Sequence, residues 1–148
     1  MDLSLQFEDN DTGHRDLVLQ FAGRQWRCDS YYLAIDWGML PDQEDADKVR
    51  AVLRQLLEQW LAAVEQLPDG GTVYLPYDFS DQCTGWLCCC RSGDEVDVSW
   101  GWADVEGYAL SPSAAGDLFE RPSGFQADGA GVKTSAAELV QAVRAMIV

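Results

Sequence analysis

The stretch LPYDFSDQCTGWLCCC, residues 75–90, holds four of the chain's five cysteines together with two carboxylates and three aromatic side chains. Tetrahedral zinc sites need cysteine or histidine side chains that converge, commonly from a C-x2-4-C spacing on a turn. On a strand Cys88 and Cys90 share one face. The side chains available to join them are those of Cys83, the distant Cys28 and the single histidine, His14. We therefore expect no metal and no cofactor, and we interpret the cysteines as small apolar side chains of a sheet.

Nucleophilic catalysis has equally little support. A cysteine nucleophile needs a thiolate that is stabilised by a cation or by a nearby base, and the sequence around residues 75–90 is acidic instead. A serine triad would depend on His14, which is remote in sequence, and no G-x-S-x-G segment is present. No glycine-rich phosphate loop follows a predicted strand. We expect no catalytic residue of these types and no bound nucleotide.

One class of enzyme, a hydrolase that uses a pair of carboxylates, is compatible with the sequence. The acids near predicted strand ends or loops are Asp36, Asp78, Asp81, Asp104 and Glu106. Two carboxylates about 5–10 Å apart serve a glycosidase, and similar groups hold Mg²⁺ or Ca²⁺. A carboxylate-dependent hydrolase is therefore an alternative, and it requires two of these acids to converge in a deep pocket.

Aromatic side chains lie beside these acids in AIDWG, DQCTGW and GWADVEGY. Protein interfaces combine aromatic anchors with a charged rim, so this mixture predicts a docking surface. The partner-binding candidates are Asp36, Trp37, Asp78, Asp81, Trp86, Trp102, Asp104, Glu106 and Tyr108. This hypothesis needs binding residues only and no catalytic group.

Three strands are predicted in the N-terminal part of the chain. Apolar and polar residues alternate over residues 3–7 and again over 17–21, on either side of the turn-rich DNDTGHRD. This pattern predicts a β-hairpin with a long loop. In SYYLAIDWG apolar residues recur at every second position from Tyr31 to Trp37, which predicts a third strand ending at Gly38.

The apolar period then changes to three and four residues, which predicts an amphipathic helix over residues 42–67. Pro41 suits its first turn, and the segment PDGG would stop it. Ser135, followed three residues later by Glu138, forms the capping box of a C-terminal helix. Between the helices, residues 111–134 are rich in Gly, Ser, Ala and Pro and predict a long surface loop.

Three further strands are predicted in TVYLPYDF, GWLCCCR and EVDVSWGW. A two-residue turn at Gly93-Asp94 would place Leu87 opposite Trp100 and Cys89 opposite Val98. The face expected beneath the long helix gathers Leu87, Cys89, Val98, Trp100 and Trp102, with Val73, Leu75, Tyr77 and Phe79. The other face holds Trp86, Cys88, Cys90, Asp97, Ser99 and Gly101, with Tyr74 and Asp78, and is too mixed for an ordinary core.

Together these elements predict a single α+β domain over residues 1–148. We expect an antiparallel β-sheet of about five or six strands, with the long helix packed on one face and the C-terminal helix nearby. The net charge argues against some classes of binding partner. The chain has 25 acidic and 10 basic residues, which give a net charge of −15. This field repels phosphate backbones and anionic lipids, so we expect no nucleic acid and no membrane as partner.

The sequence also bears on location. No N-terminal stretch has a basic flank followed by an apolar segment, and no window approaches the roughly 18 apolar residues of a membrane span. An odd number of cysteines, three of them adjacent, does not suit a disulfide framework. We expect a cytoplasmic protein with free thiols.

With YLPYDFSDQCTGWL followed by VSWGWADVEGY in a small acidic α+β chain, the sequence resembles bacterial immunity proteins, which neutralise a toxin made by the same or a neighbouring cell. The resemblance covers architecture and charge. It implies a cytoplasmic inhibitor whose negative face occupies the basic active-site cleft of a toxin, and a co-encoded toxin is one candidate partner. A carboxylate-dependent hydrolase and a non-catalytic structural interaction domain remain the alternatives.

Overall fold

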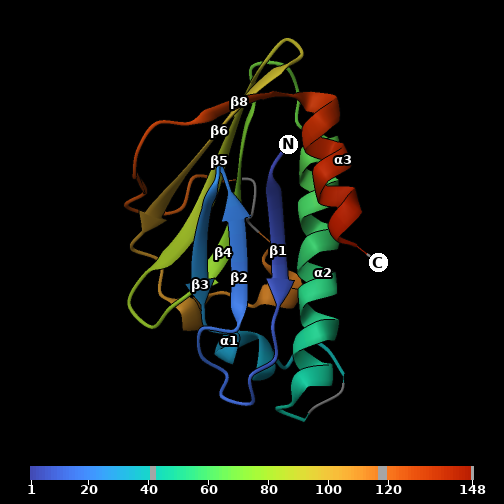
Figure 1. Ribbon diagram of the computed structural model, residues 1–148. Helices are drawn as coiled ribbons and strands as arrows, with labels where there is room; N and C mark the ends of the chain where they lie inside the picture. The colour runs from blue at the N-terminus through green and yellow to red at the C-terminus, as the bar shows by residue number, and fades with distance from the viewer. Residues whose placement is uncertain (41–42, 117–119, 148) are drawn as a thin grey trace.

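The computed structural model of the chain describes residues 1–40, 43–116 and 120–147 (Figure 1). Its first three strands form an antiparallel sheet, here called the N-terminal sheet. They are β1 (Leu3–Phe7), β2 (Leu17–Phe21) and β3 (Arg24–Cys28), paired in that order. Leu5 lies opposite Leu19, so the predicted N-terminal hairpin is confirmed.

The remaining strands form a second antiparallel sheet, here called the central sheet. They are β4 (Thr72–Phe79), β5 (Thr84–Ser92), β6 (Glu95–Ala103), β7 (Gln126–Ala127) and β8 (Val132–Ser135). Strands β4, β5 and β6 pair in order, and the short strands β7 and β8 both pair with the free edge of β6. The predicted α+β class is confirmed, with the strands divided between two sheets instead of one.

The predicted turn and register of β5 and β6 are confirmed. Leu87 lies opposite Trp100 and Cys89 opposite Val98, as a two-residue turn at Gly93-Asp94 requires. Because side chains alternate along a strand, this register places Leu87, Cys89, Val98 and Trp100 together on the face that enters the core.

The two longer helices are α2 (Ala46–Glu65) and α3 (Ala136–Met146), which lie side by side in Figure 1. Helix α2 is shorter than the predicted 42–67, because the Asp45 carboxylate accepts the backbone N–H of Lys48 and caps the helix there. The prediction for Pro41 falls outside the described residues. The Ser135 hydroxyl caps α3 through the N–H of Glu138, as predicted. Within the described part of the chain, no helix is long and apolar enough to cross a membrane.

One hydrophobic core joins both sheets to α2 and α3. Trp100 of the central sheet packs edge-on against Phe21, with ring centroids 5.8 Å apart, and lies 5.4 Å from the Trp26 ring of β3. Trp60 of α2 is fully buried and its indole N–H donates to the Pro76 carbonyl. The helix therefore packs with its apolar stripe in the same core as the predicted sheet face, although Trp102 on that face is only half-buried and lies outside the core.

The opposite face of the central sheet is covered, which corrects the expectation that it is too mixed for a core. Tyr74, Trp86 and Cys88 are buried there against Ala115 and Phe125. Both covering residues belong to the segment predicted as a long loop. That segment instead contains the 3-10 turn η2 (Pro112–Ala114), β7 and β8, while residues 117–119 lie outside the described part.

The segment Tyr31–Trp37 is not a strand. It begins with the short helix α1 (Tyr31–Ala34), in which only Leu33 is fully buried. The chain turns into α1 because the buried Asp16 carboxylate accepts both the N–H and the hydroxyl of Ser30. The third strand is β3, which follows a tight turn at Ala22-Gly23, where both residues have positive φ.

Candidate functional site

Exposed aromatic side chains gather around α1. Trp37 is 93% exposed, Tyr108 66% and Tyr31 49%, and the nearby Leu40 is also exposed. Among the described residues, the other large apolar side chain that is exposed is that of Met1. These apolar side chains remain in water and do not contribute to the packing of the core. An exposed cluster of this kind marks a place where another molecule can bind.

These rings border a groove with a volume of about 610 Å³, here called the aromatic groove. Tyr108 is carried by the 3-10 turn η1 (Gly107–Ala109), while Trp37 follows α1. The groove is lined by Tyr31, Tyr32, Ile35, Asp36, Trp37, Glu44, Tyr108, Ala109, Leu110, Ser111 and Pro112. Two segments distant in sequence thus form its walls.

Asp36 joins those two segments. Its carboxylate accepts the backbone N–H of Gly38 at 2.7 Å and that of Ser113 at 2.9 Å. The hydroxyls of Ser113 and Ser111 donate to it at 2.7 Å and 3.0 Å. Burial alone would raise the pKa of Asp36, but these hydrogen bonds stabilise the charged form and hold the pKa below its usual range. Asp36 therefore fixes the loop that carries Trp37 against the segment that follows η1.

A second link holds η1 to the β4–β5 turn. The Gly107 N–H donates to the Ser80 carbonyl at 2.7 Å. The Tyr32 hydroxyl donates to the carboxylate of Asp81, and this hydrogen bond raises the pKa of Tyr32 to about 12. Tyr32 and Tyr108 line both the aromatic groove and a neighbouring cleft beside Asp81. The aromatic groove is thus anchored from both sides by hydrogen bonds between distant segments.

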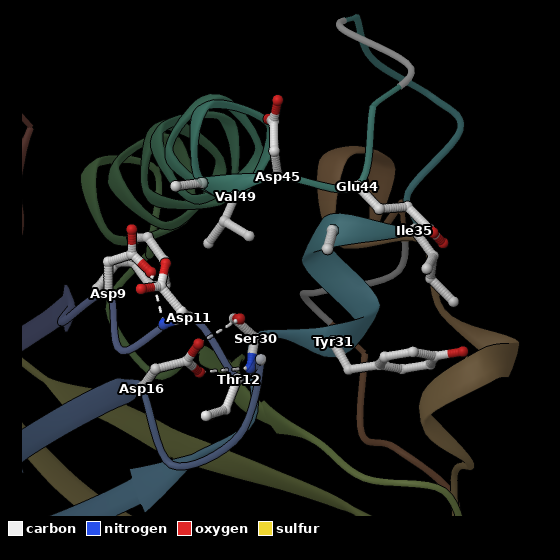
Figure 2. Close-up of a pocket in the computed structure, with 14 residues that line it drawn as sticks. Asp9, Asp11, Thr12, Asp16, Ser30, Tyr31, Ile35, Glu44, Asp45 and Val49 are labelled. Atoms are coloured by element: carbon white, nitrogen blue, oxygen red, sulfur yellow. Dashed lines mark hydrogen bonds between the residues drawn. The ribbon is translucent and has the colours of Figure 1, made fainter.

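An acidic cleft of about 440 Å³ adjoins the aromatic groove (Figure 2). Figure 2 shows Asp9 and Asp11 in the loop after β1, facing α1 across the cleft, with Asp45 at the start of α2. Tyr31, Ile35 and Glu44 line both the cleft and the groove. The two hollows therefore form one continuous surface, here called the α1 surface.

The α1 surface and the cleft beside Asp81 are strongly negative. The acids lining the acidic cleft, the aromatic groove and the cleft beside Asp81 are Asp9, Asp11, Asp16, Asp29, Asp36, Glu44, Asp45 and Asp81. Among the described residues that line these three hollows, His14 is the only basic one, and its imidazole lies 3.4 Å from the Asp29 carboxylate. A basic partner would therefore meet a complementary field here.

Part of the predicted set of binding residues lies on this surface. Trp37 and Tyr108 border the aromatic groove, and Asp81 lines the adjacent cleft. Glu106 is half-buried and directly precedes η1. Asp36 also lies here, but it is buried and its carboxylate is occupied, so its role is to position the surface.

Two predicted residues are buried and cannot touch a partner. Trp86 is 2% exposed, and its indole N–H donates to the Thr84 hydroxyl at 2.6 Å. Asp78 lies under the N-terminal sheet beside Cys28 and accepts the Ser80 hydroxyl at 2.8 Å. Burial raises the pKa of Asp78. The hydrogen bonds that its carboxylate accepts from Ser80 and Cys28 lower the pKa and offset only part of this effect. Both were predicted on the mixed sheet face, and the β-bulge between Pro76 and Asp78 is what turns Asp78 to the other side.

Trp102 and Asp104 lie at a different place. Trp102 is paired with Gln126 of β7 and is half-buried, while the exposed Asp104 bonds through its N–H to the Ser123 carbonyl. Neither lines the hollows of the α1 surface. These two candidates therefore belong to the edge covered by residues 121–127.

The sequence-based set missed Tyr31, Glu44, Asp9 and Asp11. Tyr31 was placed on the apolar side of a predicted strand where the structure has α1. Asp9 and Asp11 were taken as residues of a turn-rich loop, and Glu44 as part of the predicted helix 42–67. The acid-rich runs EDND and DQED were the available signal, and the second follows a segment that carries the exposed Trp37 and Leu40. Their convergence depends on the packing of the β1–β2 loop against α1.

The α1 surface holds groups suited to binding more than to catalysis. Asp9, Asp16 and Asp45 each accept a backbone N–H of a turn or cap, which are structural roles. Burial raises the pKa of the thiols of Cys28, Cys88 and Cys89, and none of the three lines this surface. Within the described residues, no three His, Cys, Asp or Glu side chains are grouped as metal ligands. What the surface offers is aromatic area, hydrogen-bond acceptors and negative charge.

The chain was also compared with known proteins. Models of protein families, curated proteins and solved structures all give no match to it.

Proposed function

We propose that this chain is an acidic protein-binding inhibitor that resembles an immunity protein and that acts in the cytoplasm on a basic toxin. The observation that supports this proposal best is the gathering of exposed Trp37, Tyr108 and Tyr31 on one strongly acidic surface. Neutralisation would follow from occupation of the toxin's basic cleft by the α1 surface. No catalytic group in this chain is then required.

The physics of binding favours this surface. Aromatic side chains that become buried at the centre of an interface dominate binding free energies, while surrounding charges set the association rate. The backbone segments that carry Trp37 and Tyr108 are held in position by the Asp36 hydrogen bonds and by the link of Gly107 to Ser80. Such preorganisation reduces the conformational entropy that binding would otherwise cost.

The proposal is tested by capture from the source cell with the full chain immobilised. The test variant is Trp37→Ala combined with Tyr108→Ala, and the matched control is Asp94→Lys in the β5–β6 turn, at the opposite end of the molecule from α1 (Figure 1). We expect a basic protein that is retained by the native chain and the control and lost by the double variant. Because all three positions are exposed, circular dichroism should show unchanged folding.

Function is then measured with the purified captured protein. An equimolar amount of the native chain should abolish its toxic activity, and the double variant should need at least about a hundredfold excess. Equal neutralisation by the native chain and the double variant would remove the α1 surface from the mechanism. A captured protein that is acidic, or whose activity is untouched, would contradict inhibition of a basic toxin.

A further inference from the structure

We propose that the aromatic groove receives an arginine side chain of the partner, whose guanidinium stacks on Trp37 and Tyr108 and pairs with Glu44. This inference rests on the proposed function and names the group that is recognised. It is drawn from three observations: the exposed rings, the negative charge of the groove and the way this chain treats its other rings.

The rings themselves suit a cation. Tryptophan and tyrosine faces attract a guanidinium within about 6 Å of the ring centroid, and several rings together act as a cage. The groove presents Trp37 and Tyr108 on separate segments, with Tyr31 beside Tyr32 at a centroid distance of 5.2 Å. Its volume of about 610 Å³ accepts a side chain with part of the main chain that carries it.

The charge of the groove selects a cation over an apolar side chain. Glu44 lines both the aromatic groove and the acidic cleft and is exposed. Among the described residues no ion pair neutralises it, and no lysine or arginine lines the groove. Lys48 lines an adjoining hollow with Glu44, but this lysine is buried and its ammonium donates to the Met39 carbonyl. A carboxylate beside aromatic faces is the arrangement in which an arginine gains both stacking and paired hydrogen bonds.

The chain's own arginines show the same contact elsewhere. The guanidinium of Arg24 lies over the Trp100 ring at 5.4 Å, that of Arg50 over Phe7 at 5.5 Å, and that of Arg121 over Phe125 at 5.5 Å. Within the described residues, no guanidinium or ammonium group makes such a contact with the rings of Trp37, Tyr31 or Tyr108. These rings are thus left to a cation from outside the chain.

Arginine fits better than lysine for a geometric reason. A planar guanidinium can lie flat on an indole and still direct two N–H groups to one carboxylate, whereas an ammonium is a compact and strongly hydrated charge. Stacking therefore favours arginine even where both cations feel the same negative field. The difference between the two side chains is what the experiment must measure.

The test uses the isolated full chain and short capped peptides, Gly-X-Gly, with X as arginine, lysine, citrulline or norleucine. The readout is the indole N–H signal of Trp37 in NMR spectra, assigned by its loss in Trp37→Phe. We expect the arginine peptide to shift this signal with a millimolar dissociation constant, with lysine and citrulline each weaker by about threefold or more. Glu44→Gln should weaken the arginine peptide by a similar factor, and the control Asp94→Asn should not.

Three outcomes would overturn the proposal. Equal shifts from citrulline would mean that the groove recognises planarity without charge, and equal shifts from lysine would mean that it recognises charge without stacking. A signal that none of the peptides moves would exclude an arginine subsite. In each of these cases, capture that still depends on Trp37 and Tyr108 would leave the inhibitor function standing, with a different side chain in the groove.

Discussion

Two buried aspartates show how far the environment of one residue type can differ within this chain. Asp36 accepts four hydrogen bonds from N–H and hydroxyl groups, and its pKa is held low. Asp78 is buried beside Cys28 with fewer donors, and its pKa is raised. Both were predicted as partner-binding acids, and both instead act inside the fold. Spacing alone cannot separate these cases, since it does not show which donors surround a carboxylate.

The two acids should change the pH dependence of stability in opposite directions. A lowered folded pKa means that Asp36 stabilises the fold above its unfolded pKa of about 3.9 and that this contribution is lost as the pH falls through the folded value. For Asp78 the raised folded pKa gives the reverse: its contribution is present in acid and is lost as the pH rises through the folded value. Asp36→Asn should therefore lower the free energy of unfolding near neutral pH by about 1–3 kcal/mol.

Urea unfolding between about pH 7 and pH 3 measures both effects. Relative to the native chain, Asp36→Asn should lose less stability on acidification, and Asp78→Asn should lose more. The exposed Asp94→Asn serves as the control and should follow the native curve. If Asp36→Asn and Asp78→Asn changed the slope in the same direction, the opposite roles assigned to these carboxylates would be wrong.

At the scale of elements, patterns with strong periodicity predicted the structure well. The helix α2, the three long strands of the central sheet and the register across Gly93-Asp94 follow from apolar spacing and one turn. The segment Tyr31–Trp37 also alternates but forms α1, because Asp16 holds Ser30 and Asp36 holds the following loop. Those hydrogen bonds come from distant parts of the chain and leave no local signal.

Strand β3 was not predicted, because its sequence lacks the alternating apolar pattern that marks a strand. Its sequence RQWRC has few apolar residues, and most of its side chains are exposed, so hydropathy does not mark it. Pairing with β2 is instead set by the tight turn at Ala22-Gly23, whose positive φ values are 56° and 74°. Trp26, which packs between Tyr77 and Trp100, is the residue that makes this strand part of the core.

The alternation of β5 predicts how its cysteines react. Cys89 is fully buried in the main core, Cys88 is buried under the covering segment, and Cys90 is exposed beyond it. Burial raises the pKa of Cys89, and burial together with the neighbouring Cys90 thiol raises that of Cys88 to about 11. Ellman's reagent at neutral pH should therefore label Cys90 first in the native chain and leave Cys28, Cys88 and Cys89 unlabelled.

Denaturation without a reductant should then release all five thiols. Cys90→Ser is the matched control, because it should remove the rapid phase and leave the buried cysteines unreactive. Rapid labelling of Cys88 in this control would mean that Ala115 and Phe125 do not cover this face of the sheet in solution. Fewer than five thiols in the denatured native chain would contradict the free cysteines.

At the scale of the whole molecule, function depends on which surfaces remain uncovered. Two of the predicted anchors, Trp37 and Tyr108, are exposed, whereas Trp86, which was predicted with them, is buried. Ala115 and Phe125 cover Trp86, whereas η2, which precedes Ala115, packs beside α1 and leaves the rings of Trp37 and Tyr108 exposed. Composition and spacing predict the ingredients of the α1 surface, whereas its location depends on tertiary packing.

The net charge of −15 is distributed unevenly over the surface of the molecule. The acidic cleft, the aromatic groove and the cleft beside Asp81 are lined by acids, with His14 as the only basic residue among those described. Lys48 lines a further hollow beside α1, where it is buried and its ammonium donates to the Met39 carbonyl. Lys133, Arg144 and Arg27 form ion pairs with Glu95, Glu65 and Glu8. Charge acts over a Debye length of about 8 Å at physiological salt, so acids within this distance of the interface steer a basic partner. Aromatic contacts act only after docking.

This separation of roles predicts different kinetic effects for two kinds of variant, measured by surface plasmon resonance with the captured partner. Glu44→Lys combined with Asp81→Lys should slow association and flatten its dependence on ionic strength, because it reverses charge next to the groove. Trp37→Ala should instead speed dissociation about tenfold or more, as expected when an aromatic anchor is removed. Asp94→Lys should leave both rates nearly unchanged, since it lies at the far end of the molecule. If Asp94→Lys slowed association as much as the double reversal, steering would belong to the net charge of the chain, and the α1 surface would have no special electrostatic role.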